Sequence, residues 1–126
     1  MYTQPDDPMY DVSAHIVRAQ KVVFSNTLAA SLWENTQLAK GDLTAEVKAL
    51  KAAGGKDMIV YGGSSFVTSL IREGLIDEYY LFVNPVVLGK GEGIFGGLAN
   101  YRGLVHRETL TYPSGIVLLK YVAAIP

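Results

Sequence analysis

Residues 56–72 combine an apolar run, a double glycine and a helical pattern in immediate succession, and this order constrains the fold more than any other stretch. The run at 58–61 is rich in residues that favour β-structure, so it predicts a short buried strand. Gly62 and Gly63 then allow a tight turn in which the backbone can approach a ligand. Beyond the turn, the apolar side chains of a predicted helix share one face: Phe66, Val67, Leu70 and Ile71.

The start of this predicted helix is a candidate anion site. Ser64 or Ser65 is expected to cap the helix. The unpaired N–H groups of its first turn and the positive end of its dipole suit a phosphate. An ordinary strand-to-helix connection without a ligand explains the same residues equally well, because such turns are common in folds that bind nothing there. From these residues alone, both interpretations stay open.

The remaining patterns predict strands that alternate with helices and then a closing hairpin. The expected elements are a helix within 9–20, a strand at 21–24, a short extended piece within 33–38, a helix near 43–51 capped by Asp42, a strand at 78–87, an irregular segment at 88–98, and strands at 105–111 and 115–122. This order predicts an α/β fold with a mixed sheet, flanking helices and a C-terminal antiparallel hairpin. We expect one domain over residues 1–126.

The composition argues against several classes of function. The formal net charge is −1 and no cluster of Lys or Arg occurs, so no nucleic-acid partner is expected. The absence of cysteine excludes disulfides and thiol nucleophiles, and His15 and His106 lie in neither a metal-ligand nor a triad spacing, so no metal site is expected. The polar start and the lack of a long apolar run predict no membrane partner and a cytoplasmic location.

One glycine spacing is misleading. Gly91, Gly93 and Gly96 match the pattern G-x-G-x-x-G of dinucleotide-binding folds. That pattern must open a helix within a strand–helix–strand unit, whereas residues 98–103 form a poor helix and precede a hairpin. We interpret the spacing as a coincidence within a glycine-rich loop.

Residues 74–96, taken with 21–28, resemble the dihydrofolate-reductase-like superfamily. The closest branch is the C-terminal reductase domain of the bifunctional riboflavin-biosynthesis deaminase/reductase and its stand-alone relatives. The resemblance covers about residues 21–121. It depends on three motifs in the right order: the strand end at Ser25, the double-glycine turn, and the loop at 85–91.

The resemblance implies a cofactor, NADPH, and a place for each of its ends. The strand end would lie near the ribose and 2′-phosphate, and the glycine turn with its helix start around the diphosphate. The residues so implied are Ser25, Asn26, Thr27, Gly62, Gly63, Ser64, Ser65 and Phe66. Many relatives carry a cation where this chain has Asn26, so NADH is not excluded. Without the resemblance, residues 25–27 are better explained as a polar turn.

The resemblance also implies a substrate side. Glu78 would accept hydrogen bonds from substrate hydroxyls as the candidate catalytic residue, and Leu88, Gly89 and Gly91 would border the substrate. A solvated acid at the start of a strand explains Glu78 about as well. The function implied is hydride transfer from NAD(P)H to a small pterin-like or ribosylamino-pyrimidine-like substrate, chemistry in which the protein chiefly orients the cofactor. The alternative is a non-catalytic nucleotide-binding or regulatory dimer that keeps the cofactor cradle.

The front of the chain departs from the family pattern. Relatives usually begin with two strand motifs that are not found before Lys21, so the front strands of the sheet are expected to be absent. Either the chain is truncated at its N-terminus or another subunit completes the sheet. Since an unpaired inner edge invites pairing with a second chain, we expect a homodimer.

Overall fold

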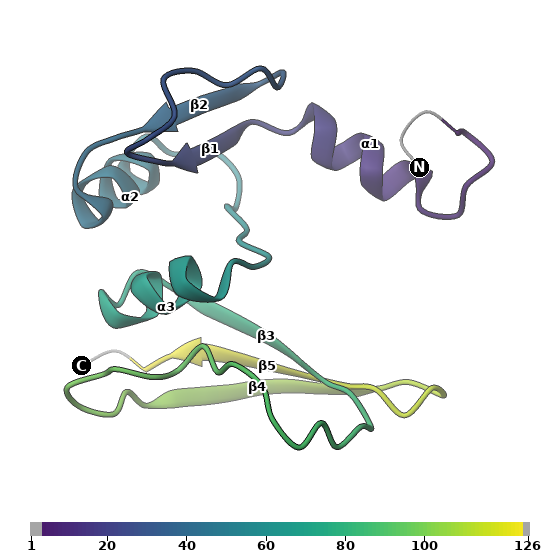
Figure 1. Ribbon diagram of the computed structural model, residues 1–126. Coiled ribbons are helices and arrows are strands. Elements are labelled where there is room, and N and C mark those ends of the chain that lie inside the picture. The colour runs from purple at the N-terminus through teal and green to yellow at the C-terminus, as the bar shows by residue number, and fades with distance from the viewer. Residues whose placement is uncertain (1–3, 125–126) are drawn as a thin grey trace. The chain divides into compact units, whose positions relative to one another are not determined.

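A computed structural model describes residues 4–124 as two compact units, one ending at Ala52 and the other beginning at Ala53 (Figure 1). The elements in chain order are α1 (Tyr10–Arg18), β1 (Lys21–Phe24), β2 (Thr36–Ala39), α2 (Leu43–Ala52), α3 (Ser64–Arg72), β3 (Glu78–Val83), β4 (Leu104–Thr111) and β5 (Val117–Ala123). This is the predicted α/β class. No helix among residues 4–124 is long and apolar enough to cross a membrane. The expectation of one domain over 1–126 stays a prediction.

The first unit is built on a parallel pair, β1 and β2, in which Val23 lies opposite Leu38. Its helix α2 begins as the sequence predicts, because the Ala45 N–H donates to Asp42 Oδ2 at 3.0 Å. Val47 of this helix is buried. The Lys21 ammonium donates to the Val17 carbonyl at 2.7 Å, which ties the start of β1 to the end of α1.

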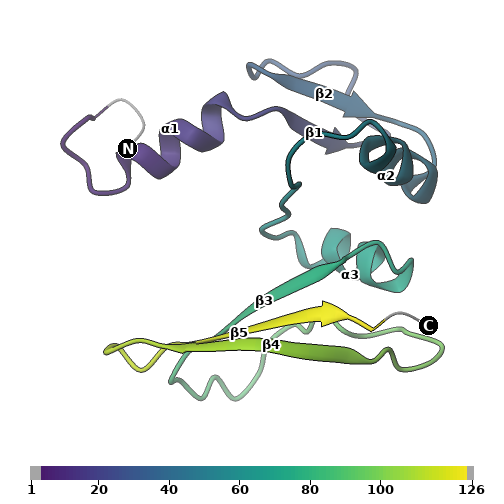
Figure 2. The same ribbon diagram turned by 180° about the vertical axis from the view of Figure 1, so that it is seen from behind.

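The second unit contains a three-stranded antiparallel sheet in the order β3-β5-β4, with the predicted hairpin formed by β4 and β5. Helix α3 lies along one face of this sheet in both views (Figures 1 and 2). The buried side chains of the unit come from the helix, the turn after it and the sheet: Leu70, Ile71, Leu75, Tyr79 and Leu118. Burial alternates along β3, since Tyr79 is buried and Tyr80 is 54% exposed, as expected for a sheet with one covered face.

Helix α3 ends at a glycine turn. Gly74 has φ +67°, its N–H donates to the Ile71 carbonyl, and the Leu75 N–H reaches back to the Leu70 carbonyl at 3.0 Å. This pair of hydrogen bonds, with the two buried leucines beside it, is the Schellman arrangement of helix C-termini. The turn brings the chain directly from α3 into β3.

The strand predicted at 58–61 is wrong. These residues form no regular element, and Ile59 and Tyr61 are 73% and 76% exposed. An apolar run becomes a strand only where a neighbouring strand pairs with its backbone. In the described part of this unit, β5 pairs with both β3 and β4, and no strand pairs with 58–61. Strand β3 is also shorter than predicted, because it ends at Val83 before Pro85.

Candidate functional site

The start of α3 differs from the sequence prediction in how it is capped. The residue before the helix is Gly63, with φ +80° and ψ +87°, and no side chain caps this end. Ser64 and Ser65 are instead the first two helical residues, so the predicted serine cap is wrong. The positive φ of Gly63 explains the difference, because the cap position needs a conformation that serine rarely adopts. Gly63 has no side chain, so the cap position itself supplies no acceptor to the first N–H groups of α3.

An open groove of about 480 Å³ runs along α3. One wall is the helix and the other is part of the glycine loop, which we define as residues 88–98. The lining residues are Ser64, Ser65, Thr68, Ser69 and Arg72 from the helix, and Glu92, Gly93, Gly96 and Gly97 from the loop. We call this feature the α3 groove.

Polar side chains of α3 fasten the glycine loop to the helix. Thr68 Oγ1 lies 3.0 Å from the Ile94 carbonyl oxygen and 2.7 Å from that of Ser64. Nearer the N-terminus of the helix, Ser64 Oγ donates to Glu92 Oε2 at 2.9 Å. Together with a third contact at Arg72, these hydrogen bonds hold the irregular loop at the edge of the helix.

Arg72 makes that third contact at the C-terminal end of the groove. Its Nε donates to the Gly96 carbonyl at 3.3 Å. A Cβ built at Gly97 lies 2.7 Å from Arg72 Cζ, so the guanidinium, the far end of a flexible side chain, would have to shift to admit it. The Arg72 carbonyl accepts a 2.6 Å hydrogen bond from Arg102. The backbone carbonyl and the side chain of Arg72 thus each make one hydrogen bond.

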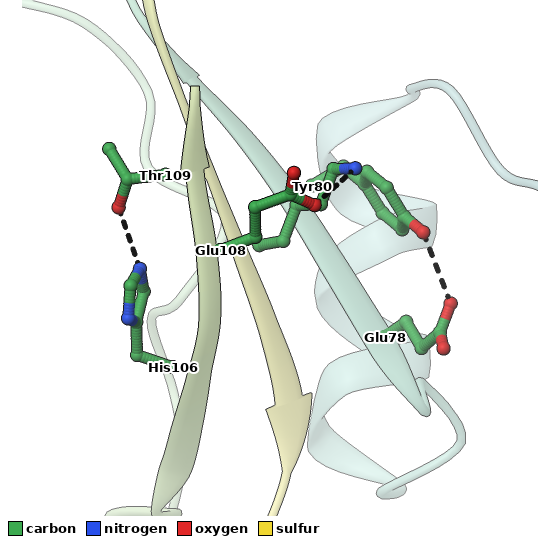
Figure 3. Close-up of polar contacts among 6 residues, drawn as sticks. Glu78, Tyr80, His106, Glu108 and Thr109 are labelled. Carbon is green, nitrogen blue, oxygen red and sulfur yellow. Dashed lines mark hydrogen bonds and ion pairs between the residues drawn. The ribbon is translucent and has the colours of Figure 1, made fainter. Parts of the chain in front are cut away.

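Glu78 is the exposed first residue of β3, and polar side chains of the sheet lie near it (Figure 3). The Tyr80 hydroxyl donates to Glu78 Oε2 at 3.4 Å. Lys120 lies opposite Tyr80 on β5, with its ammonium 5.4 Å from the ring centroid, and donates to Glu108 of β4 at 2.9 Å. This hydrogen bond is the main cause that raises the pKa of Lys120 above its usual 10.5. We call these four residues the sheet-face network.

The other predicted substrate residues are not joined to Glu78. Leu88 is 78% exposed in the glycine loop, and Gly89 turns the chain with φ +77°. Gly91 is also exposed, and a Cβ there would meet nothing within 4 Å. Among the described residues, no hydrogen bond connects Glu78 with this part of the loop.

The three residues predicted near the ribose form a compact turn after β1. Ser25 continues the parallel pairing, with its N–H on the Ala39 carbonyl at 3.3 Å. Its hydroxyl oxygen accepts the N–H groups of Thr27 and Leu28 at 3.2 and 3.1 Å. Asn26 is exposed between them. This turn belongs to the unit that ends at Ala52, whereas the glycine turn before α3 belongs to the other unit.

Sequence reasoning missed the polar lining of the α3 groove. Thr68, Ser69 and Arg72 follow Ser64 and Ser65 at helical spacing, and this pattern could have predicted a polar stripe beside the apolar face. Glu92 carries no such signal, because its contact with Ser64 joins residues 28 positions apart.

Two solved structures share the fold. A putative riboflavin biosynthesis protein from Shewanella sp. PV-4 matches with a TM-score of 0.73 at 19% identity, over 97% of this chain and 84% of its own. A pyrimidine reductase-like protein from Corynebacterium diphtheriae NCTC matches with a TM-score of 0.59 at 17% identity, over 83% of this chain and 50% of its own. The chain thus shares the fold of these two proteins, and the predicted α/β fold class is confirmed.

The chain belongs to the RibD C-terminal domain family, which matches residues 4–118. Among curated proteins, it is similar to two uncharacterized proteins of Bacillus subtilis (strain 168). YyaP is 36% identical over 102 residues, which are 81% of this chain and 54% of YyaP. YwjB is 36% identical over 75 residues, which are 60% of this chain and 42% of YwjB. The chain thus spans about half the length of the curated relatives it matches.

Proposed function

We propose that this protein is a reductase that transfers hydride from NAD(P)H to a small pterin-like or ribosylamino-pyrimidine-like substrate. The observation that carries the proposal is the uncapped start of α3 after the glycine turn, in a chain of the RibD C-terminal domain family. The printed descriptions of the two structural neighbours, a riboflavin biosynthesis protein and a pyrimidine reductase-like protein, agree with this class of chemistry.

The residues at the start of α3 fit a diphosphate. The positive end of the α3 dipole attracts an anion there. Gly62 leaves space, since a Cβ built on it meets nothing within 4 Å. The Glu92 carboxylate accepts the hydrogen bond of the Ser64 hydroxyl, so a negative charge lies beside this position and opposes an anion there. When bound, the cofactor supplies the hydride, and these residues orient it.

The adenosine end is assigned to the turn after β1. Asn26 is exposed there, with no positive charge of its own for a 2′-phosphate. We therefore include both NADPH and NADH, with NADPH as the expected cofactor. Binding measured with the two nucleotides side by side tests this choice, and equal affinities would show that the 2′-phosphate is not recognised.

Glu78 is assigned to the substrate. Its one hydrogen bond within the described residues is the 3.4 Å contact from Tyr80, so its carboxylate oxygens keep capacity to accept from substrate hydroxyls. Leu88, Gly89 and Gly91 are exposed in the glycine loop and would border the same substrate.

Two glycine substitutions test the cofactor site. Gly62→Ala adds a methyl group at a residue without a positive φ, so the protein should melt as the wild type does. If the turn approaches a diphosphate, this methyl group should lower NADPH affinity at least about tenfold, measured by titration calorimetry. Gly63→Ala is the strain control, because φ +80° disfavours alanine and should lower stability itself. Unchanged affinity in folded Gly62→Ala would contradict the diphosphate assignment.

A non-catalytic nucleotide-binding or regulatory dimer is the second candidate. It is favoured by the lack of any described hydrogen bond between Glu78 and the glycine loop, which leaves the substrate side unassembled. NADPH oxidation over a panel of pterin and pyrimidine substrates, set beside direct binding, separates the two functions. Turnover supports the reductase, and binding without turnover supports the second candidate.

The expected homodimer is part of both candidates. Ile59 and Tyr61 are apolar and exposed, and Phe82 on the open sheet face is 60% exposed. Burial of about 800 Å² on each partner would suffice for a specific dimer that covers such residues. Light scattering at low micromolar concentration measures the mass directly. A well-dispersed monomer with a cooperative melt would contradict this proposal.

A further inference from the structure

The glycine loop is attached to α3 in two different ways. Residues 94–97 are held through their backbone, since side chains of the helix contact two carbonyl oxygens there. Residues 88–93 are held by one side chain, because the Glu92 carboxylate accepts from the Ser64 hydroxyl at 2.9 Å. In the part of the chain that the structure describes, residues 88–93 make no other hydrogen bond. The first half of the loop therefore depends on Glu92 for its place at the helix.

The backbone on both sides of Glu92 lies in open space. All of residues 88–93 are exposed, and a Cβ built on Gly91 or Gly93 would meet nothing within 4 Å. A glycine on each side of Glu92 also gives the backbone there a wide choice of conformations. Little packing therefore opposes a movement of this segment away from the helix once the hydrogen bond of Glu92 is lost.

The Glu92 carboxylate lies beside the position that we assign to the cofactor diphosphate. Ser64 is the first residue of α3, so its partner carboxylate is near the positive end of the helix dipole, which favours a negative charge. The Ser64 hydroxyl has one proton to donate, and it can serve either Glu92 or a phosphate oxygen. The two anions also repel each other at such a short separation. The carboxylate of the chain and a bound diphosphate therefore compete for the start of α3.

We propose that Glu92 is an internal competitor of the cofactor and links cofactor binding to the release of residues 88–93. In the free protein its carboxylate occupies the anion position, and the bound diphosphate displaces it. Displacement removes the one hydrogen bond that holds this segment, whereas residues 94–97 stay attached through their backbone. The released segment includes the loop residues assigned above to the substrate, so the cofactor prepares the substrate side. This inference rests on the proposed function.

Calorimetric titration of the full chain with NADPH tests the competition. Glu92→Gln keeps an oxygen that can accept from Ser64 and removes the charge, so NADPH affinity should rise at least about fivefold. The charge-matched control is Glu108→Gln on β4, outside the groove lining, which should keep the affinity within about twofold of the wild type. Both glutamates are exposed, so both variants should fold and melt close to the wild type.

Cleavage by trypsin after Lys90 measures the release of the segment separately from affinity. Lys90 is exposed within residues 88–93, and a segment that leaves the helix is a better protease substrate. NADPH should therefore speed this cleavage in the wild type at least about twofold. Glu92→Ala lacks the hydrogen bond altogether, so it should be cleaved faster without NADPH and should not respond to its addition.

The outcomes separate this inference from the proposed function. The inference is overturned if Glu92→Gln binds NADPH no more tightly than Glu108→Gln, or if NADPH leaves the cleavage of the wild type unchanged. In both cases NADPH still binds, and the proposed function stands. Absence of NADPH binding in the wild type and in both glutamine variants overturns the inference and the proposed function together.

Discussion

The α3 groove and the sheet-face network contain similar residue types but use them differently. In the groove, Thr68 and Arg72 hydrogen-bond to backbone carbonyls of the glycine loop, and each keeps part of its side chain toward the open space. In the network, Lys120 contacts Glu108 and the Tyr80 ring, so its charge is balanced by neighbouring side chains. Polar groups that bond to backbone carbonyls retain capacity for a ligand, whereas groups that pair with one another, Lys120 with Glu108 in the network and Ser64 with Glu92 in the groove, use part of it up.

The largest effect on stability is expected from a substitution in the buried side of α3, beneath the groove. Leu70 is 6% exposed on the buried side of α3. Leu70→Ala should lower the free energy of unfolding by about 2–5 kcal/mol, because it removes buried methyl groups and leaves a cavity. Since the groove needs α3 seated on the sheet, NADPH binding should weaken as well. Urea unfolding and calorimetry measure the two effects.

The control for Leu70→Ala is on the other face of the sheet. Phe82 is 60% exposed, so Phe82→Ala should cost less than about 1 kcal/mol despite the larger side chain removed. Equal losses for the two variants would mean that the open face is covered in solution, which would support the dimer.

Glu78→Gln tests whether the network has capacity left for a substrate. The amide keeps the shape and removes the charge, so turnover should fall at least about tenfold while NADPH affinity stays the same. Steady-state kinetics with the best substrate of the panel measures the change. Glu108→Gln in the same network is the matched control and should keep the wild-type rate. A wild-type rate for Glu78→Gln would identify Glu78 as a surface acid.

A buried phenol below α3 gives a smaller, pH-dependent effect. Burial, partly opposed by Arg102, raises the pKa of Tyr79 above 10.0. Above about pH 10 the unfolded chain therefore loses this proton first, and stability falls as pH rises toward the folded pKa. Tyr79→Phe should reduce this alkaline loss of stability, measured by urea unfolding at about pH 9 and pH 11. Tyr80→Phe, an exposed position, is the comparison, and an identical slope in both variants would contradict the assignment.

The smallest effect is expected at the Lys120–Glu108 ion pair. Its side chains are 28% and 49% exposed, so solvent screens the pair. Glu108→Gln should leave the melting temperature unchanged at neutral pH and should bring the pKa of Lys120 down toward its usual 10.5, measured by NMR titration of the lysine. A clear drop in melting temperature would show that the network is more than a set of surface contacts.

Local patterns in the sequence predicted most of the elements, and the misses have a common cause. Helix α3 and the β4–β5 hairpin were predicted because apolar spacing and turn residues specify them within a few positions. The run at 58–61 has strand composition, but a strand also needs a partner, which composition does not supply. Likewise, the glycine turn marked the candidate site, whereas Glu92 joined it through a contact between residues far apart in the sequence.

The position of β5 at the centre of its sheet governs how this unit can fold during synthesis. Strands β3 and β4 do not pair with each other, and both depend on β5, which is made after them. A nascent chain that has emerged only as far as β4 has a helix and two strands with no sheet to join. The slow step of folding should therefore wait for residues 117–123 to leave the ribosome, since distant strands close last. Until then β3 lacks the strand with which its backbone pairs.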